Sequence, residues 1–137
     1  MGWLGLDDTD SLKGGCTTEV LFQLLEGLPD TVAFRNPRLV RLWPFAKQRT
    51  RGNAAVAVEL ITENEPELLT HLDLWWDKHI VSLKGEVATS DHSERRQYPA
   101  DPGMIWTSEL IVNEAFYKSA VSSHIELQNL PEVTRYW

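Results

Sequence analysis

Hydrophobic positions follow two different spacings in the first part of the chain. An apolar run over residues 2–6 gives way to polar residues at Asp7, which predicts a short buried strand. Further along, hydrophobic residues recur three and four positions apart, which predicts a helix with one buried face. Its expected inward residues are Val20, Leu21, Leu24, Leu25 and Leu28. Thr17 or Thr18 is the expected N-cap of this helix.

A return to strand-like patterns follows this helix. Residues 38–43 alternate between two faces, and residues 54–60 form a second apolar run. The two segments fit a hairpin whose long connection carries three basic residues, Lys47, Arg49 and Arg51.

The second half of the chain carries less regular patterns. Residues 65–80 have helical spacing, residues 85–103 read as a long polar loop, residues 104–112 fit a strand, and residues 113–124 fit a short helix. The expected inward residues of that last helix are Ala115, Phe116, Ala120 and Val121. These elements predict an α+β or α/β single domain, with a mixed sheet of about four or more strands flanked by two to three helices.

Composition agrees with one globular domain. The chain has 137 residues, of which 42% are hydrophobic and 24% charged. No apolar run approaches the ~20 residues that span a membrane. The first residues lack a basic region followed by an apolar core and a cleavage site, so we expect no secretory signal. Cys16 is the only cysteine, which excludes an internal disulfide and a multi-cysteine zinc site. We therefore expect a cytoplasmic protein with no membrane partner.

The charges are segregated along the sequence. The net charge of −7 argues against a nucleic-acid-binding surface over the whole domain. Residues 31–58, however, contain no Asp or Glu and carry six of the thirteen basic residues. Such a segment suits phosphate groups of a nucleotide or of a nucleic acid. A basic strand face paired with acids elsewhere in the fold is the alternative.

Candidate functional side chains are most concentrated in one segment, LGLDDTDSLKGGCTT, at residues 4–18. Asp7, Asp8 and Asp10 crowd three carboxylates at the end of the first strand, ahead of a Gly14-Gly15 turn and a helix N-terminus. Three anions this close repel one another unless water or a cation intervenes. Carboxylates can hold Mg²⁺ together with substrate phosphates, and glycines let the backbone approach a phosphate. Solvated turn and cap residues are the alternative interpretation.

The same stretch resembles the N-terminal region of the archaeal agmatinylcytidine synthetases, which use ATP to attach agmatine to the wobble cytidine of an isoleucine tRNA. Two ordered motifs carry the resemblance: GLDDTDSLKGGCTT at residues 5–18 and NPRLVRLWPFAKQRTRGNAAVAVEL at residues 36–60. DPGMIW and NEAFYKSAV, within residues 101–121, add a weaker match.

The resemblance implies a kinase-like domain that uses ATP and Mg²⁺ to phosphorylate the C2 oxygen of cytidine, after which agmatine displaces the phosphate. It implies Mg²⁺ ligation by Asp7, Asp8 and Asp10, and places Thr17, with Thr18 beside it, at an autophosphorylated position. The implied contacts to phosphate or base come from Gly14, Gly15, Arg38, Arg41, Arg51, Gly52 and Asn53.

The chain also departs from that family pattern. It has neither the length nor the cysteines for the OB domain and zinc ribbon of the full enzymes, and Trp43 and Phe45-Ala46 replace other residues in the second motif. It therefore fits one module of a split or truncated enzyme, which needs a partner chain, or a stand-alone relative with another substrate. Weak binding of tRNA by the isolated chain is expected. A non-catalytic nucleotide-binding or interaction module is the alternative function.

Overall fold

The computed structural model describes residues 1–10, 16–46, 54–85, 88–89, 96–97, 99–110 and 112–137. Its central element is a five-stranded sheet with strand order β2-β3-β1-β6-β7. The strands are β1 (Gly2–Asp7), β2 (Ala33–Arg41), β3 (Ala54–Ile61), β6 (Gly103–Thr107) and β7 (Arg135–Tyr136). The helices are α1 (Thr17–Glu26), α2 (Glu65–His79) and α3 (Glu114–Ala120). Single 3-10 turns span Val81–Leu83 and Leu127–Asn129.

Each pair of neighbouring strands in this sheet is antiparallel. Because β1 and β2 both run antiparallel to β3, they are parallel to each other, and α1 connects them with β3 lying between. In the same way α2 connects β3 to the described strand β6, with β1 between. Two such interleaved β-α-β units make a ferredoxin-like arrangement. The α+β class is therefore confirmed, whereas the expected mix of parallel and antiparallel neighbours is not found among the described strands.

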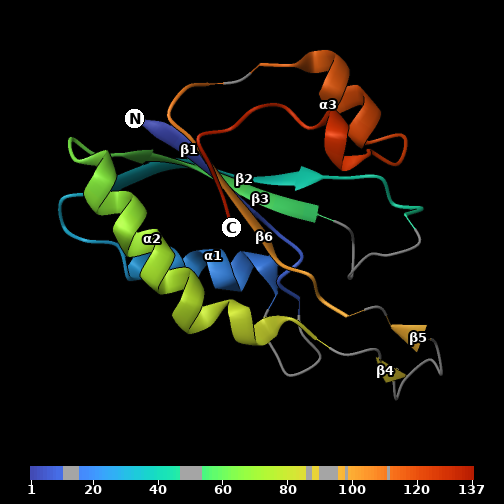
Figure 1. Ribbon diagram of the computed structural model, residues 1–137, viewed down its shortest axis with the longest axis horizontal. Coiled ribbons are helices and arrows are strands. Elements are labelled where there is room, and N and C mark those ends of the chain that lie inside the picture. The colour runs from blue at the N-terminus through green and yellow to red at the C-terminus, as the bar shows by residue number, and fades with distance from the viewer. Residues whose placement is uncertain (11–15, 47–53, 86–87, 90–95, 98, 111) are drawn as a thin grey trace.

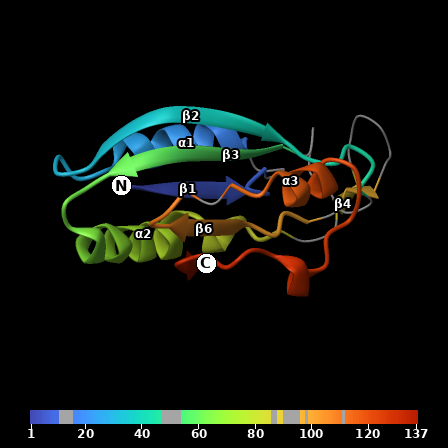
Figure 2. The same ribbon diagram turned by 90° about the horizontal axis from the view of Figure 1, so that it is seen from above.

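Both long helices cover the same face of the sheet, as Figures 1 and 2 show. Leu4 and Leu6 of β1 point toward them and are almost fully buried, as is Trp106 of β6. The predicted inward residues Val20, Leu21 and Leu24 of α1 are buried, and Leu25 and Leu28 pack at the edge of this core. The alternate residues of the strands and the residues spaced three and four apart on the helices thus pack together in one hydrophobic layer.

The other face of the sheet carries the alternate residues of each strand, and we call it the open face. On β1 these are Trp3, Gly5 and Asp7, all partly exposed. Helix α3 lies on this side of the molecule, opposite α1 and α2 (Figure 1), and all seven of its residues keep some exposure. Among the described residues, no helix is long and apolar enough to cross a membrane.

Several predicted boundaries were wrong. Strand β2 starts five residues before the predicted start at Arg38, because a bulge between Arg35 and Arg38 takes up the Asn36-Pro37 pair that reads as a turn in sequence. Strand β6 ends at Thr107 rather than at Val112. The polar loop contains two short strands, β4 (Ala88–Thr89) and β5 (Arg96–Gln97), paired with each other.

The predicted helix over residues 113–124 is shorter and less buried than expected. Helix α3 has seven residues, none of them buried, and Ala115 is exposed instead of facing inward. Phe116, Ala120 and Val121 are only half-buried. Its Asn113 side chain accepts a hydrogen bond from the Phe116 N–H at 2.9 Å and so caps the helix.

Candidate functional site

The acidic turn, residues 7–10, begins at the last residue of β1. Asp7 pairs with Gly103 of β6, and its place in the alternation puts its side chain on the open face. Asp8 follows with a φ of 54°, in the left-handed region that Asp tolerates better than most residues. This backbone turn sends the chain to the helix-covered side, where Asp10 meets the start of α1.

Each carboxylate of the acidic turn accepts a hydrogen bond from a different backbone N–H. The N–H of Asp8 donates to Asp7 Oδ1 at 2.7 Å, that of Asp101 to Asp8 Oδ2 at 2.9 Å, and that of Thr17 to Asp10 Oδ1 at 2.9 Å. The turn is therefore held to the segment before β6 and to α1. These are the turn and cap roles of the alternative interpretation.

The three carboxylates diverge too much to act as one ligand set. Within the described part of the chain, no group of three or more His, Cys, Asp and Glu side chains is placed to hold a metal ion. Mg²⁺ in nucleotide enzymes commonly takes only one or two protein carboxylates, with substrate phosphates and water completing its shell. Asp7 and Asp8, adjacent at the end of β1, provide suitable hard oxygen donors for such a cation.

The electrostatics of the turn disfavour an isolated Asp7 carboxylate. Burial raises the pKa of Asp7 from 3.8 to about 6, and the charges of Asp8 and Asp10 push it in the same direction. The hydrogen bond from the Asp8 N–H opposes this rise in pKa. Since Asp7 is still mainly ionised at neutral pH, a cation beside it would stabilise the charge that the fold disfavours.

The N-terminus of α1 is capped differently from the prediction. Cys16, with extended backbone angles, is the N-cap, and its side chain makes no capping hydrogen bond. Thr17 and Thr18 instead lie within the first turn, and Asp10 supplies the missing acceptor for the Thr17 N–H. The Cys16 thiol lies 2.9 Å from Thr18 Oγ1, and this hydrogen bond lowers the pKa of Cys16.

The two threonines differ in exposure. Thr17 is buried, and its hydroxyl donates to Asp10 Oδ1 at 3.4 Å. Thr18 is exposed. A phosphoryl donor approaching the folded domain therefore meets the hydroxyl of Thr18 more readily than that of Thr17.

The predicted phosphate-binding residues are only partly placed. Arg38 lies on the open face with Asp7, two strands away, and its guanidinium stacks 5.7 Å from the centre of the Trp3 ring. Arg41 is the last residue of β2, opposite Ala54. The other five lie outside the described residues, so their roles stay predictions: Gly14, Gly15, Arg51, Gly52 and Asn53.

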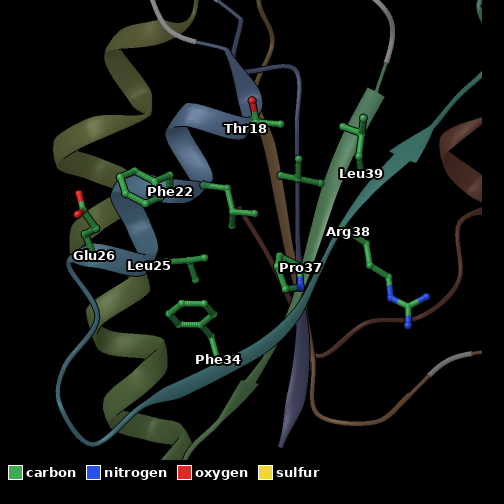
Figure 3. Close-up of a pocket in the computed structure, with 10 residues that line it drawn as sticks. Thr18, Phe22, Leu25, Glu26, Phe34, Pro37, Arg38 and Leu39 are labelled. Carbon is green, nitrogen blue, oxygen red and sulfur yellow. The ribbon is translucent and has the colours of Figure 1, made fainter.

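Sequence reasoning missed a pocket between α1 and β2 with a volume of about 470 Å³ (Figure 3). It is lined mainly by hydrophobic side chains, and Phe22 of α1 and Phe34 of β2 remain 59% and 49% exposed beside it. Its signal was present in the sequence, since Thr18, Phe22 and Glu26 recur every four residues on one face of the helix.

Comparison with known proteins gives a consistent result. Residues 3–65 match the family model of the TiaS TCKD domain. The chain is 36% identical over 131 residues to TiaS, the isoleucine-tRNA 2-agmatinylcytidine synthetase, of Pyrobaculum neutrophilum, covering 90% of this chain and 28% of that protein. The TiaS of Ignisphaera aggregans is 33% identical over 144 residues, covering 96% of this chain and 28% of the relative.

A solved structure supports the same conclusion. The crystal structure of TiaS in complex with an isoleucine tRNA and ATP superposes on this chain with a TM-score of 0.64 and 26% sequence identity, over 93% of this chain and 28% of that one. The chain thus spans little more than a quarter of the length of these relatives. In sequence and in fold the chain resembles a part of TiaS, the isoleucine-tRNA 2-agmatinylcytidine synthetase, and its residues 3–65 match the TiaS TCKD domain.

Proposed function

We propose that residues 1–137 form an ATP- and Mg²⁺-dependent phosphoryl-transfer domain of the agmatinylcytidine synthetase type. The observation that carries the proposal is the acidic turn itself, in which Asp7 and Asp8 follow one another at the end of β1 and Asp10 accepts a hydrogen bond from the Thr17 N–H at the start of α1. This junction lies inside the region that matches the TiaS TCKD domain. Carboxylates and a helix N-terminus together suit a metal-bound triphosphate.

In this proposal Asp7 and Asp8 hold Mg²⁺, which neutralises charge on the transferred phosphoryl group when bound. The γ-phosphoryl group moves from ATP to the C2 oxygen of cytidine. The amine of agmatine then attacks C2, and the C2–O bond breaks with phosphate as the leaving group. Positioning and charge neutralisation do most of the work in such transfers.

The net charge of this chain and its short length relative to the relatives indicate which regions bind the tRNA. The relatives act on an isoleucine tRNA, as their names state, and are more than three times as long as this chain. A domain with a net charge of −7 gains little from the counterion release that drives RNA binding. We therefore assign most of the tRNA affinity, and part of the agmatine site, to protein regions beyond these residues or to a partner chain.

Isothermal titration of the chain with ATP, with and without Mg²⁺, tests the proposal. Asp8→Asn removes the negative charge but keeps an oxygen that can accept from the Asp101 N–H, so the fold should survive. We expect this variant to lose more than about tenfold in MgATP affinity. Asp77→Asn, an exposed change of the same charge on α2, is the matched control.

Equal MgATP affinity of wild type and Asp8→Asn would contradict a metal site at the acidic turn. Such equal affinity would favour the alternative function, a nucleotide-binding module without catalytic activity. Absence of MgATP binding in every variant would reject the proposal for this chain on its own.

A further inference from the structure

The edge strand β2 leaves hydrophobic side chains uncovered on the helix-covered side of the sheet. In the pairing of β2 with β3, Phe34 lies opposite Leu60 and Leu39 lies opposite Val56. Leu60 and Val56 are buried in the core, whereas Phe34 and Leu39, on the same side of the sheet, are 49% and 53% exposed. Helix α1 packs on β3 and β1, so the core side of the edge strand stays largely uncovered.

Helix α1 forms the other wall of the pocket between α1 and β2. Its Phe22 side chain lines the pocket and is 59% exposed, with Leu21 and Leu25 beside it. Figure 3 shows Phe22, Leu25 and Phe34 around the same space. Since α1 has ten residues and a helix rises 1.5 Å per residue, this wall is about 15 Å long. Uncovered apolar surface of this kind commonly marks an interaction site.

The charge at the pocket is negative. Two of its lining residues are charged, Glu26 and Arg38. The Arg38 guanidinium stacks on the Trp3 ring at the open face, and Figure 3 shows the Arg38 side chain turned away from the pocket. Glu26 is the last residue of α1, whose last turn has no basic residue, although the C-terminus of a helix favours positive charge. A cation beside Glu26 would therefore stabilise both the carboxylate and the helix end.

We propose that this pocket docks an amphipathic helix of a partner protein, with a lysine or arginine beside its apolar face. The partner helix would lie next to α1 and cover Phe34 and Leu39. Helices bind such surfaces through apolar side chains spaced three and four positions apart. No residue of the acidic turn lines the pocket, so this site is separate from the proposed nucleotide site.

Two other occupants fit the pocket less well. An added strand needs an unbroken edge, but β2 has a bulge between Arg35 and Arg38, Pro37 has no N–H to donate, and Asn36 has a φ of 54°. A second copy of this chain would bring two acidic surfaces together, because a twofold interface uses the same patch on both subunits. The net charge of −7 opposes such an association.

The test uses two synthetic helical peptides of about 15 residues, a length that can form a stable helix on binding. Both carry leucines along one face, and one has lysines beside this face where the other has glutamates. Fluorescence anisotropy measures their binding to the full chain. We expect the lysine peptide to bind saturably and about tenfold or more tightly than the glutamate peptide. Amide NMR shifts should map its site to residues 18–26 and to Phe34 and Leu39.

Four variants locate the contacts. Phe22→Ala should weaken binding of the lysine peptide by about tenfold or more, because it removes a central aromatic anchor. Phe45→Ala, which removes a 75% exposed ring outside the pocket, should leave this affinity unchanged. Glu26→Lys should reverse the preference, so that the glutamate peptide binds more tightly. Asp77→Lys, the same charge change at an exposed residue of α2, should keep the wild-type preference. Thermal melting checks that each variant is folded.

Each contrary result would overturn the docking proposal. Such results are no saturable binding of the lysine peptide, equal affinity for the two peptides, or an affinity that Phe22→Ala leaves unchanged. Amide shifts centred on α2 or α3 would place the peptide elsewhere and also reject it. A wild-type dimer that Phe22→Ala converts to monomer would assign the pocket to a second copy of the chain. The proposed function is tested separately, by the MgATP affinity of Asp8→Asn.

Discussion

The backbone N–H of Thr17 donates to Oδ1 of Asp10 at 2.9 Å, and the two residues lie seven positions apart. Helix α1 thereby takes its capping acceptor from the acidic turn, since the side chain of its own N-cap, Cys16, makes no such bond. The contact joins the most acidic stretch of the chain to a helix N-terminus. Any change in the turn that displaces Asp10 will also affect the start of α1.

Replacing Asp10 should therefore reduce stability more than replacing an exposed aspartate. Asp10→Ala removes the acceptor of the Thr17 N–H and a favourable charge at the helix N-terminus, so we expect a loss of about 1 kcal/mol in the free energy of unfolding. Asp10→Asn, which keeps an oxygen at the position of Oδ1 but no charge, should recover part of it. Urea denaturation measures both values, with Asp77→Ala as the control on an exposed helix face. Equal stability of Asp10→Ala and wild type would show that the bond is not significant in solution.

The contribution of Asp7 to the stability of the metal-free protein should fall as the pH rises from about 4 to about 6. The pKa of Asp7 is raised in the folded state, so between these values the folded protein binds more protons than the unfolded chain. Its contribution is complete at low pH and is lost as Asp7 ionises. The full shift corresponds to about 3 kcal/mol, and solvent at the open face reduces the expected loss to about 1–2 kcal/mol.

Asp7→Asn isolates this effect, because its amide cannot ionise. The variant should be more stable than the wild type at pH 7 and equally stable near pH 4. Urea denaturation across this pH range measures the difference. If the free energy of unfolding of Asp7→Asn varies with pH as that of the wild type does, another group is responsible for the pH dependence.

Much of the fold was readable in the sequence, and the failures have physical causes. Strands β1 and β3 and helices α1 and α2 were placed within about two residues, because each has a long, regular hydrophobic pattern. The first half of β2 was missed because Asn36-Pro37 suggests a turn, whereas the structure uses it as a bulge. Helix α3 was overestimated because its short apolar pattern packs against too little to be buried.

The site was less predictable than the fold. The sequence located the acidic turn, yet local spacing could not reveal that Asp8 accepts from Asp101, ninety-three residues away. Nor could it show that Asp7 and Asp10 serve opposite faces of the sheet, since that depends on the backbone angle at Asp8. The pocket could not be predicted from local spacing either, because its lining comes from α1, β2 and β3, and the packing of these three elements is not visible in the sequence.

The stability of the C-terminal strand β7 should depend on Asp73. One carboxylate oxygen of this α2 residue accepts from Trp137 Nε1 at 2.6 Å and from Arg135 at 2.8 Å. Asp73→Ala leaves both donors to solvent, so we expect a stability loss of about 1 kcal/mol and faster amide exchange at residues 135–137. Hydrogen exchange measured by mass spectrometry tests this. If amide exchange at residues 135–137 stays as slow as in the wild type, the backbone pairing of β7 with β6 is enough to hold the strand in place.

Phosphorylation by the proposed kinase activity should occur on Thr18 more than on Thr17. Thr17 is buried with its hydroxyl directed to Asp10, whereas Thr18 is exposed in the first turn of α1, where a phosphate also gains from the helix dipole. Mass spectrometry after incubation with MgATP should locate the phosphate on residue 18. Thr18→Val should abolish the modification, whereas Thr17→Val, which keeps its N–H to Asp10, should retain it. Phosphate found mainly on Thr17 would require the start of α1 to open during the reaction.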